Sequence, residues 1–328
     1  MPTKNDISLI SIIFFIVFVS LGYILYQTTG ASSIKSMVEQ MLHREQVIAR
    51  SGAASITSFV DMTSRSLLIL SNNNINSEVL NTFTKNWSGT PVVGIIFTDT
   101  KGEIKLVASN SEDLSSGGNV SNRDYFIEAS KSPNNSISIG KPFISRVPGA
   151  NQTTYKIPIA TPVFSNNKFI GVLAVSISIP SLADKYLNSL KISSRTGIFL
   201  ISSNGDFLNG SIPETADENI FQLAEEHPFL GDKIIIPMIR QKLALTQETK
   251  LDIAIPDFTT EKITRTLIAS SPTNLSPSMK SMLVVTTPLE DALIFISPFM
   301  FRNIILVIVI YIISITISLF VFSHFIKK

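Results

Sequence analysis

The sequence predicts an α+β protein: one long helix near the N-terminus, then two modules of mainly antiparallel strands, with a membrane-spanning helix at either end. Three observations lead to this prediction. Uncharged apolar runs lie near both ends of the chain, at 7–27 and 304–323. A stretch with helical character and no proline follows the first run. Short apolar runs separated by turn-forming residues fill most of the remainder, as expected for strands and hairpins.

Both apolar runs are long enough to cross a membrane. Ile7–Gln27 and Ile304–Ser323 contain no charged residue, and about 20 apolar residues in a helix span the bilayer core. A cleaved signal peptide is the alternative for the first run, but its start is more basic and its apolar core is only about 7–15 residues long. Lys4 is the one basic residue before this run. We therefore expect a retained helix and a two-pass protein of the cell membrane, with its central region outside the cytoplasm.

The segment after the first apolar run predicts a stalk helix. Residues 31–72 contain no proline and one glycine, Gly52. Apolar pairs recur from Met37/Val38 to Phe59/Val60 among polar residues, which is the pattern of a helix with one apolar stripe. The run Asn72–Asn74 favours a break, after which a short helix is expected.

The stretch Lys141–Ile179 predicts three strands joined by turns at 148–151 and 165–168. Its last strand, 169–179, alternates with period two. One face carries the bulky Leu173, Val175, Ile177 and Ile179, and the other carries Val172, Ala174, Ser176 and Ser178. Such a sheet can bury its bulky face against a helix and leave the small face to line a cavity.

Further elements are expected on both sides of this stretch. A hairpin at 91–108 turns at Asp99–Gly102, and 122–130 is a short helix. The second module opens with a hairpin around Asn204-Gly205. Its other expected elements are helices at 218–226 and 234–245 and strands at 251–255, 265–270 and 282–287, and a helix at 181–191 is expected to connect the two modules.

Composition excludes several classes of function. The net charge is +2 with no basic cluster, so no nucleic-acid partner is expected. Cysteine is absent, which rules out disulfides, thiolate metal sites and a cysteine nucleophile. His43, His227 and His324 stand far apart in sequence. No glycine-rich phosphate loop, His-Glu-x-x-His or Gly-x-Ser-x-Gly pattern occurs, so we expect no enzyme, no metal and no cofactor.

Four features together resemble the double Cache sensor domain, the extracytoplasmic ligand-binding part of many bacterial and archaeal receptors. They are the Asn-Arg-Asp-Tyr-Phe run in Asn122–Ala129, the hairpin at 142–179, the segment Arg195–Leu208, and one membrane helix on each side. The resemblance covers Gly30–Arg302. It implies two tandem PAS-like modules on the stalk helix, ligand binding in the membrane-distal module, and a homodimer whose stalk helices pack together.

The expected segments follow from these observations and the resemblance. They are a cytoplasmic tail 1–6, a transmembrane helix 7–29, the stalk helix 30–80, the membrane-distal module 81–190, the membrane-proximal module 191–302, a second transmembrane helix 303–325 and a cytoplasmic end 326–328.

The resemblance also implies a ligand site in the distal module. In the amino-acid-binding subset of the family, an Arg and aromatic residues hold the ligand and an Asp on the last strand grips its amine. Here Ser176 stands in place of that Asp and Gly118 in place of an expected tyrosine, so no carboxylate is expected for an α-amine. The resulting candidate ligand-binding residues are Arg123, Tyr125, Phe126, Phe143, Ser145, Ala174 and Ser176.

Three of these side chains, and Ser178 on the same strand face, have an alternative role. The Arg123 guanidinium can hold a carboxylate or phosphate in two hydrogen bonds, or it can pair with Asp124 or with an acidic residue at the surface. Tyr125 can close over a ligand or pack in the core. Ser176 and Ser178 can line a cavity or face solvent.

We therefore expect a sensor of a small extracytoplasmic molecule, with a carboxylate or other anion as its ligand and no catalytic activity. The short tails leave no room for a signalling domain, so either this is the sensing part of a longer receptor or it signals through a partner. Two alternatives remain: a structural or adhesive surface protein with the same fold, and an extracytoplasmic hydrolase.

Overall fold

The structure is a computed structural model, and it describes residues 4–110, 116–144, 155–209, 219–222, 235–256, 263–276, 279–294, 305, 308–309, 311–313 and 315–316. Contacts divide the chain into two units, Arg44–Pro288 and the pair of terminal segments Met1–His43 and Leu289–Lys328. Across the described part of the chain, no helix has both the length and the apolarity that a membrane crossing needs. The two membrane-spanning helices stay predictions.

Helix α1 is the long N-terminal helix, Lys4–Ser71. It ends where the asparagine run begins, and side-chain amides of Asn72 and Asn73 donate to the carbonyl oxygens of Leu68 (3.1 Å) and Ile69 (2.8 Å) in its last turn. Helix α2, Ser77–Asn86, begins after Asn76, whose side-chain oxygen accepts the Val79 N–H at 2.9 Å. The break predicted at Asn72–Asn74 is confirmed.

The first sheet is antiparallel and its strands lie in the order β2-β1-β6-β5-β3, with β4 also paired to β5. The strands are β1 Val92–Thr98, β2 Ile104–Ser109, β3 Ser138–Ile139, β4 Phe143–Ile144, β5 Tyr155–Ser165 and β6 Lys168–Ser178. The β5–β6 turn is formed by Asn166 and Asn167 with φ of 50° and 62°, values that asparagine tolerates better than most residues. This turn was predicted; the one predicted at 148–151 lies outside the described residues.

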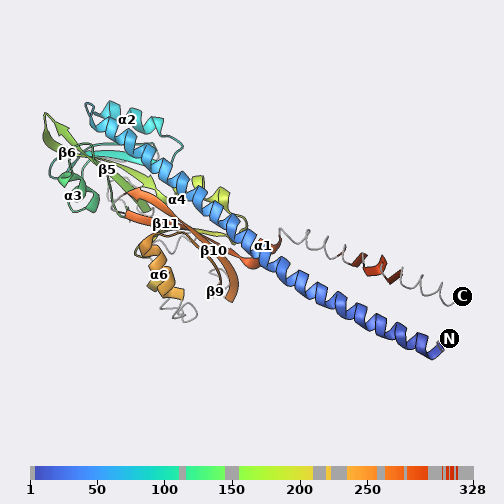
Figure 1. The fold of residues 1–328 in the computed structure, drawn as a ribbon. Helices are drawn as coiled ribbons and strands as arrows, with labels where there is room; N and C mark the ends of the chain where they lie inside the picture. The colour runs from blue at the N-terminus through green and yellow to red at the C-terminus, as the bar shows by residue number, and fades with distance from the viewer. Residues whose placement is uncertain are drawn as a thin grey trace. The chain divides into compact units, whose positions relative to one another are not determined.

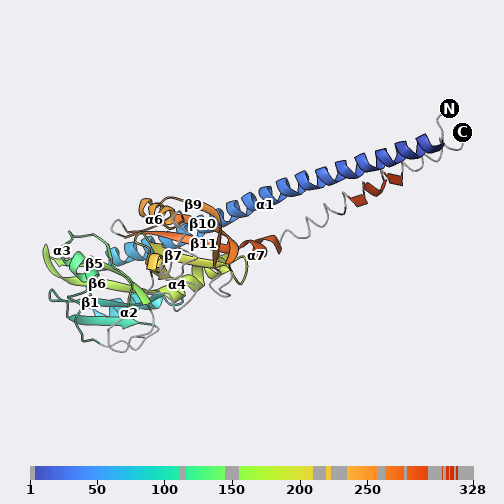
Figure 2. The ribbon, with the colours of Figure 1, turned by 90° about the horizontal axis from the view of Figure 1, so that it is seen from below.

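The two faces of the first sheet are covered by different helices, as Figure 2 shows for α2 and α3. Leu173, Val175 and Ile177 of β6 join the large apolar cluster that also contains residues of α1, α2 and α4 (Ile179–Tyr186). Val172 and Ala174 join a smaller cluster with α3, Asp124–Lys131. The alternation predicted for the last strand is confirmed, and so is a helix against its bulky face.

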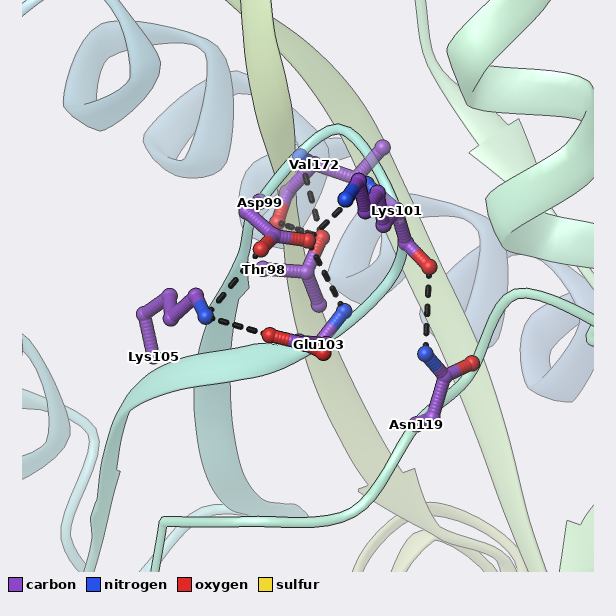
Figure 3. A network of polar contacts seen from close by, with 7 residues as sticks. All are labelled: Thr98, Asp99, Lys101, Glu103, Lys105, Asn119 and Val172. Carbon is purple, nitrogen blue, oxygen red and sulfur yellow. Dashed lines mark hydrogen bonds and ion pairs between the residues drawn. The ribbon is translucent and has the colours of Figure 1, made fainter.

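A polar network closes the β1–β2 hairpin (Figure 3). The Asp99 carboxylate accepts the N–H groups of Lys101 (2.9 Å) and Glu103 (3.0 Å) and pairs with the Lys105 ammonium at 3.1 Å. Burial acts to raise the pKa of Asp99, but the hydrogen bond from Glu103 N–H, the Lys105 ammonium and Lys101 N–H outweigh it and hold this pKa below its usual value. The carboxylate therefore fixes the turn that the sequence predicted at Asp99–Gly102.

The same end of β1 is locked onto β6. The buried Thr98 hydroxyl donates to the Val172 carbonyl and accepts the Val172 N–H, each at 3.2 Å. Next to it, Gly171 has φ of +157°, and a Cβ there would overlap the Thr98 carbonyl oxygen. Only glycine allows the two strands to approach this closely.

The second sheet has the order β8-β7-β11-β10-β9 and is also antiparallel. After the short helical turn Asn188–Leu190, its elements are β7 Gly197–Ser202, β8 Phe207–Asn209, α6 Ile235–Leu245, β9 Thr249–Pro256, β10 Ile263–Ser276 and β11 Met279–Pro288. Gly205 turns the β7–β8 hairpin with φ of 92°, as Asn204-Gly205 predicted. The three strands expected after 250 are present and longer than expected. Of the helix expected at 218–226, the structure describes residues 219–222, and 220–222 are helical.

Helix α1 runs along both sheets between Arg44 and Ser71 (Figure 1). At the second sheet the contact is partly polar: the Gln46 side-chain amide donates to the Ser270 carbonyl at 2.8 Å, and the Arg50 guanidinium pairs with both Glu248 oxygens at 2.8 and 2.5 Å. A Cβ on Gly52 would overlap Leu283 of β11. The helix therefore lies directly on this sheet.

Candidate functional site

The start of α3 is tied to the segment before β4 by Asp124. Its carboxylate accepts the backbone N–H of Lys141 at 2.8 Å and that of Tyr125 at 2.7 Å. A Cβ on Gly140 would lie 2.7 Å from Asp124 Oδ1 and 2.9 Å from Tyr125 Cβ, so the first turn of α3 rests closely on this segment. Both Asp124 oxygens are thus used by backbone groups.

Arg123 stacks on an aromatic ring. Its guanidinium carbon lies 5.1 Å from the centroid of the Phe143 ring, and Nη2 donates to the Ile144 carbonyl at 3.3 Å. The side chain is half-buried and forms no ion pair with Asp124, although both residues are described. The pairing with Asp124 that the sequence left open is therefore absent. A guanidinium with one long hydrogen bond keeps most of its N–H donors for another partner.

Further aromatic side chains lie close to the Phe143 ring. The ring centroids of Tyr125 and Phe143 are 5.9 Å apart, and Tyr125 and Phe126 are 3% and 5% exposed. Burial raises the pKa of Tyr125 above its usual value, although the nearby Arg123 charge opposes this. Tyr125 is therefore a neutral phenol throughout the physiological range.

The sheet beneath α3 carries several small side chains. In the strand register, Ser176 stands between Gly94 and Pro158, and Ala174 stands between Ile96 and Ala160. Directly paired residues share a face, so these rows form one surface. Ala174 is buried and Ser176 is partly exposed. No described side chain on this face of β5 and β6 is acidic.

Two residues that the sequence reasoning missed lie on the same face. Lys156 of β5, 1% exposed, pairs with Phe143 of β4 and with Ser178 of β6. Ser138 of β3 pairs with Ala160 and is also 1% exposed, and its hydroxyl has no hydrogen-bond partner among the described residues. The period-two pattern of 155–165 puts Lys156 on the same face as Ala160. The pairing register with 169–179 would have shown that this is also the face of Ala174.

The structure thus brings several of the expected site residues together. Arg123 and Tyr125 both contact the Phe143 ring. Phe126 and Ala174 belong to the same buried cluster, with Phe143 packed against it. Ser176 lies two residues beyond Ala174 on β6. Ser145 is outside the described residues. Within the described ranges, no group of His, Cys, Asp or Glu side chains could hold a metal ion.

Comparison with known proteins places this arrangement in a family. The sequence profile described as the Cache domain matches residues 24–293. No curated protein matches the chain significantly.

Solved structures share the fold at low identity. The extracellular domain of the putative histidine kinase vpHK1S-Z8 is 18% identical, with a TM-score of 0.53, over 80% of this chain and 95% of that one. The ligand-binding domain of the Pseudomonas fluorescens chemoreceptor CtaA, solved with L-isoleucine, is 14% identical, with a TM-score of 0.56, over 81% and 99%. A domain of a putative sensory box/GGDEF family protein from Vibrio parahaemolyticus is 17% identical, with a TM-score of 0.53, over 79% and 98%. At these identities the comparison shows a shared fold and nothing further.

Proposed function

Because the chain belongs to the Cache-domain family, as a double Cache sensor domain, we propose that it senses a small molecule outside the cytoplasm and has no catalytic activity of its own. The observation that carries this proposal is the Arg123–Phe143–Tyr125 group above a floor of small side chains. A cation, a flat ring and a neutral hydroxyl over such a floor are suited to hold a small ligand.

The charge of the site favours an anionic ligand. Arg123 supplies a guanidinium, and the Asp124 carboxylate beside it is engaged by two backbone N–H groups. A guanidinium fork matches the two oxygens of a carboxylate. We therefore propose a small carboxylate or similar anion, bound by Arg123 and flanked by Tyr125, with Phe126, Phe143, Ser145, Ala174 and Ser176 as the further lining residues.

An α-amino group is not required in this proposal. The CtaA domain was solved with L-isoleucine, L-serine, L-leucine and L-valine, each of which carries an ammonium group. In this chain the corresponding face of β6 presents Ala174 and Ser176, and a buried ammonium without a carboxylate is unfavourable. A carboxylic acid without an amine fits the described residues better.

Two further elements of the proposal concern the membrane and the assembly. The uncharged runs 7–27 and 304–323 are proposed to cross the cell membrane, with 30–302 outside. Within these runs a Cβ on Gly22 would lie 2.8 Å from the Tyr311 ring, so the two runs meet at these two residues. The stalk is proposed to form a homodimer, because Met62 and Ile69 of α1 are exposed by 50% and 68% and seven residues apart, on one side of the helix. Ligand binding would then shift the paired helices and reach a signalling domain or partner.

The test of ligand binding uses the full chain in lipid nanodiscs. A thermal-shift screen of small acids identifies the best ligand, since a ligand at one hundred times its dissociation constant adds about 2.7 kcal/mol. Calorimetry then compares wild type with Arg123→Ala, which removes a charge-assisted hydrogen bond worth roughly 1.5–3 kcal/mol, or about ten- to a hundredfold in affinity. Arg65→Ala is the matched control, because Arg65 is an exposed arginine of α1 that pairs with Asp61. Equal affinities for wild type and Arg123→Ala, or a cation as the best ligand, would contradict the proposal.

A further inference from the structure

We propose that Glu45 is a proton-binding site of the unit Arg44–Pro288, and that loss of its proton loosens the packing of α1 on β11. The inference goes beyond the proposed function, because its ligand is a proton and its residues lie outside the Arg123 group. Three observations lead to it: a buried carboxyl group without a hydrogen-bond partner, a chain of hydroxyl groups beside it, and its place where the chain enters the unit.

Glu45 lies on the buried side of α1. It is 0% exposed, and Ala49 and Ala53, at successive intervals of four residues, are buried on the same face. Neither carboxyl oxygen of Glu45 has a hydrogen-bond partner of ordinary geometry among the described residues. An ionised carboxylate in such a place is costly, whereas the neutral acid avoids most of this cost. The packing of α1 on the second sheet therefore favours the protonated form.

Hydroxyl groups connect Glu45 to the partly exposed Ser193. The Thr287 hydroxyl of β11 is close enough to the carboxyl group to act on its ionisation. Thr287 Oγ1 lies 3.1 Å from Thr196 Oγ1, which lies 3.2 Å from Ser193 Oγ. Because a hydroxyl both donates and accepts, this chain can pass a proton between solvent and Glu45 while α1 stays on the sheet.

The charged groups around Glu45 do not replace the proton. Arg44 is exposed, and its charge only partly opposes the effect of burial, which raises the pKa of Glu45 to about 7. On the sheet face that carries Thr287, Asp252 and Arg265 pair with each other at 2.7 and 2.6 Å. The other titratable or charged residues of strands β9 to β11, or within four residues of Glu45, Thr196 or Thr287, are exposed or have a partner of their own: His43, Arg195, Lys250, Lys280, Glu290 and Asp291.

The position of this cluster in the chain gives the proton its effect. The unit begins at Arg44 and ends at Pro288, so Glu45 is its second residue and Thr287 its second-to-last. Both connections to the terminal segments therefore leave the unit next to the proton site. A change in packing between α1 and β11 at this point acts on the two connections together, as protonation switches do in other proteins.

The experiment uses the full chain in nanodiscs at pH 6 and pH 8, on either side of the pKa. Infrared difference spectra should show the carbonyl band of a protonated carboxylic acid that is lost at pH 8, and this band should be missing in Glu45→Gln. Hydrogen exchange, corrected for its intrinsic pH dependence, then measures the protection of 44–53 and 281–288. A proton bound with a pKa of about 7 in the packed state and 4.5 in the loosened one predicts protection about tenfold lower at pH 8. Glu45→Gln should keep the high protection at both pH values, and Glu39→Gln, at an exposed position of α1, should follow the wild type.

Each result decides the inference without reference to the acid ligand, because neither measurement involves the Arg123 group. If the infrared band persists in Glu45→Gln, the proton is not on Glu45 and the assignment is wrong. If protection changes equally in wild type and Glu45→Gln, Glu45 holds a proton that does not control the packing, and the inference is overturned. Should Glu45→Gln not fold, the wild-type pH profiles decide: the band and the protection must share one midpoint, and separate midpoints refute the coupling.

Discussion

The stability of this protein should depend on pH through one buried carboxyl group of α1. Glu45 is 0% exposed, and neither carboxyl oxygen has a hydrogen-bond partner of ordinary geometry among the described residues. Burial raises the pKa of Glu45 from 4.5 to about 7, and the nearby Thr287 hydroxyl and the Arg44 charge only partly oppose it. The folded protein therefore favours the protonated form of this side chain.

The sign and size of the change in stability with pH follow from proton linkage. Because the folded pKa lies above the unfolded one, the folded state binds more protons between pH 4.5 and 7, and stability falls as pH rises through this window. Each pKa unit between the two states corresponds to about 1.4 kcal/mol. The stability present below pH 4.5 should thus be reduced by about 3 kcal/mol above pH 7.

The assay compares wild type with Glu45→Gln in urea at pH 5 and pH 8. Trp87 is the only tryptophan and packs against Phe59 and Phe83 with ring centroids 5.9 Å apart in each pair, so its fluorescence reports unfolding of the module. Other titrating groups are common to both proteins. We therefore expect the wild type to lose about 2.5 kcal/mol relative to Glu45→Gln between the two pH values.

A matched control is Glu39→Gln, because Glu39 is exposed on the same helix. This variant should follow the wild-type pH dependence. If the stabilities of wild type and Glu45→Gln change in parallel between pH 5 and pH 8, Glu45 does not titrate as its burial requires, and the reasoning is refuted.

Three further predictions concern packing, assembly and topology. Gly171→Ala should destabilise the protein by about 2 kcal/mol or more in the same urea assay, because a Cβ would overlap the Thr98 carbonyl at a positive φ; an unchanged midpoint would contradict the close approach of these strands. Single cysteines along Met37–Ile48 should crosslink between subunits with helical periodicity and change with ligand, whereas a flat profile would count against both the dimer and the proposed helix shift. Protease outside intact cells should cut within 30–302, and survival of that region until lysis would reverse the proposed topology.

Local sequence patterns predicted much of the fold because their physical causes are local. Asn166 and Asn167 tolerate the positive φ that a tight hairpin needs, so the turn could be placed without tertiary information. The alternation along 172–177 separated the face that packs on α1 from the face beneath α3. The asparagines after Ser71 marked the end of the long helix.

The candidate site was only partly predictable. The Asn122–Ala129 motif indicated Arg123 and Tyr125, and the resemblance indicated Phe143. Nothing local distinguished an Arg123 paired with Asp124 from one stacked on Phe143, because that choice depends on how the start of α3 rests on the segment before β4.

What the sequence determined by itself was the order of elements, their turns and the inward face of each strand, since these depend on neighbours in the chain. Tertiary structure decided which polar side chains are buried. Glu45 lies in a polar stretch of helix and Lys156 at the start of a strand, positions typical of surface residues. Both are buried because another part of the chain covers them: Glu45 lies near Thr287 of β11, and Lys156 pairs with Phe143. Burial is a property of contacts distant in sequence, and it changes what a carboxyl or an ammonium group can do.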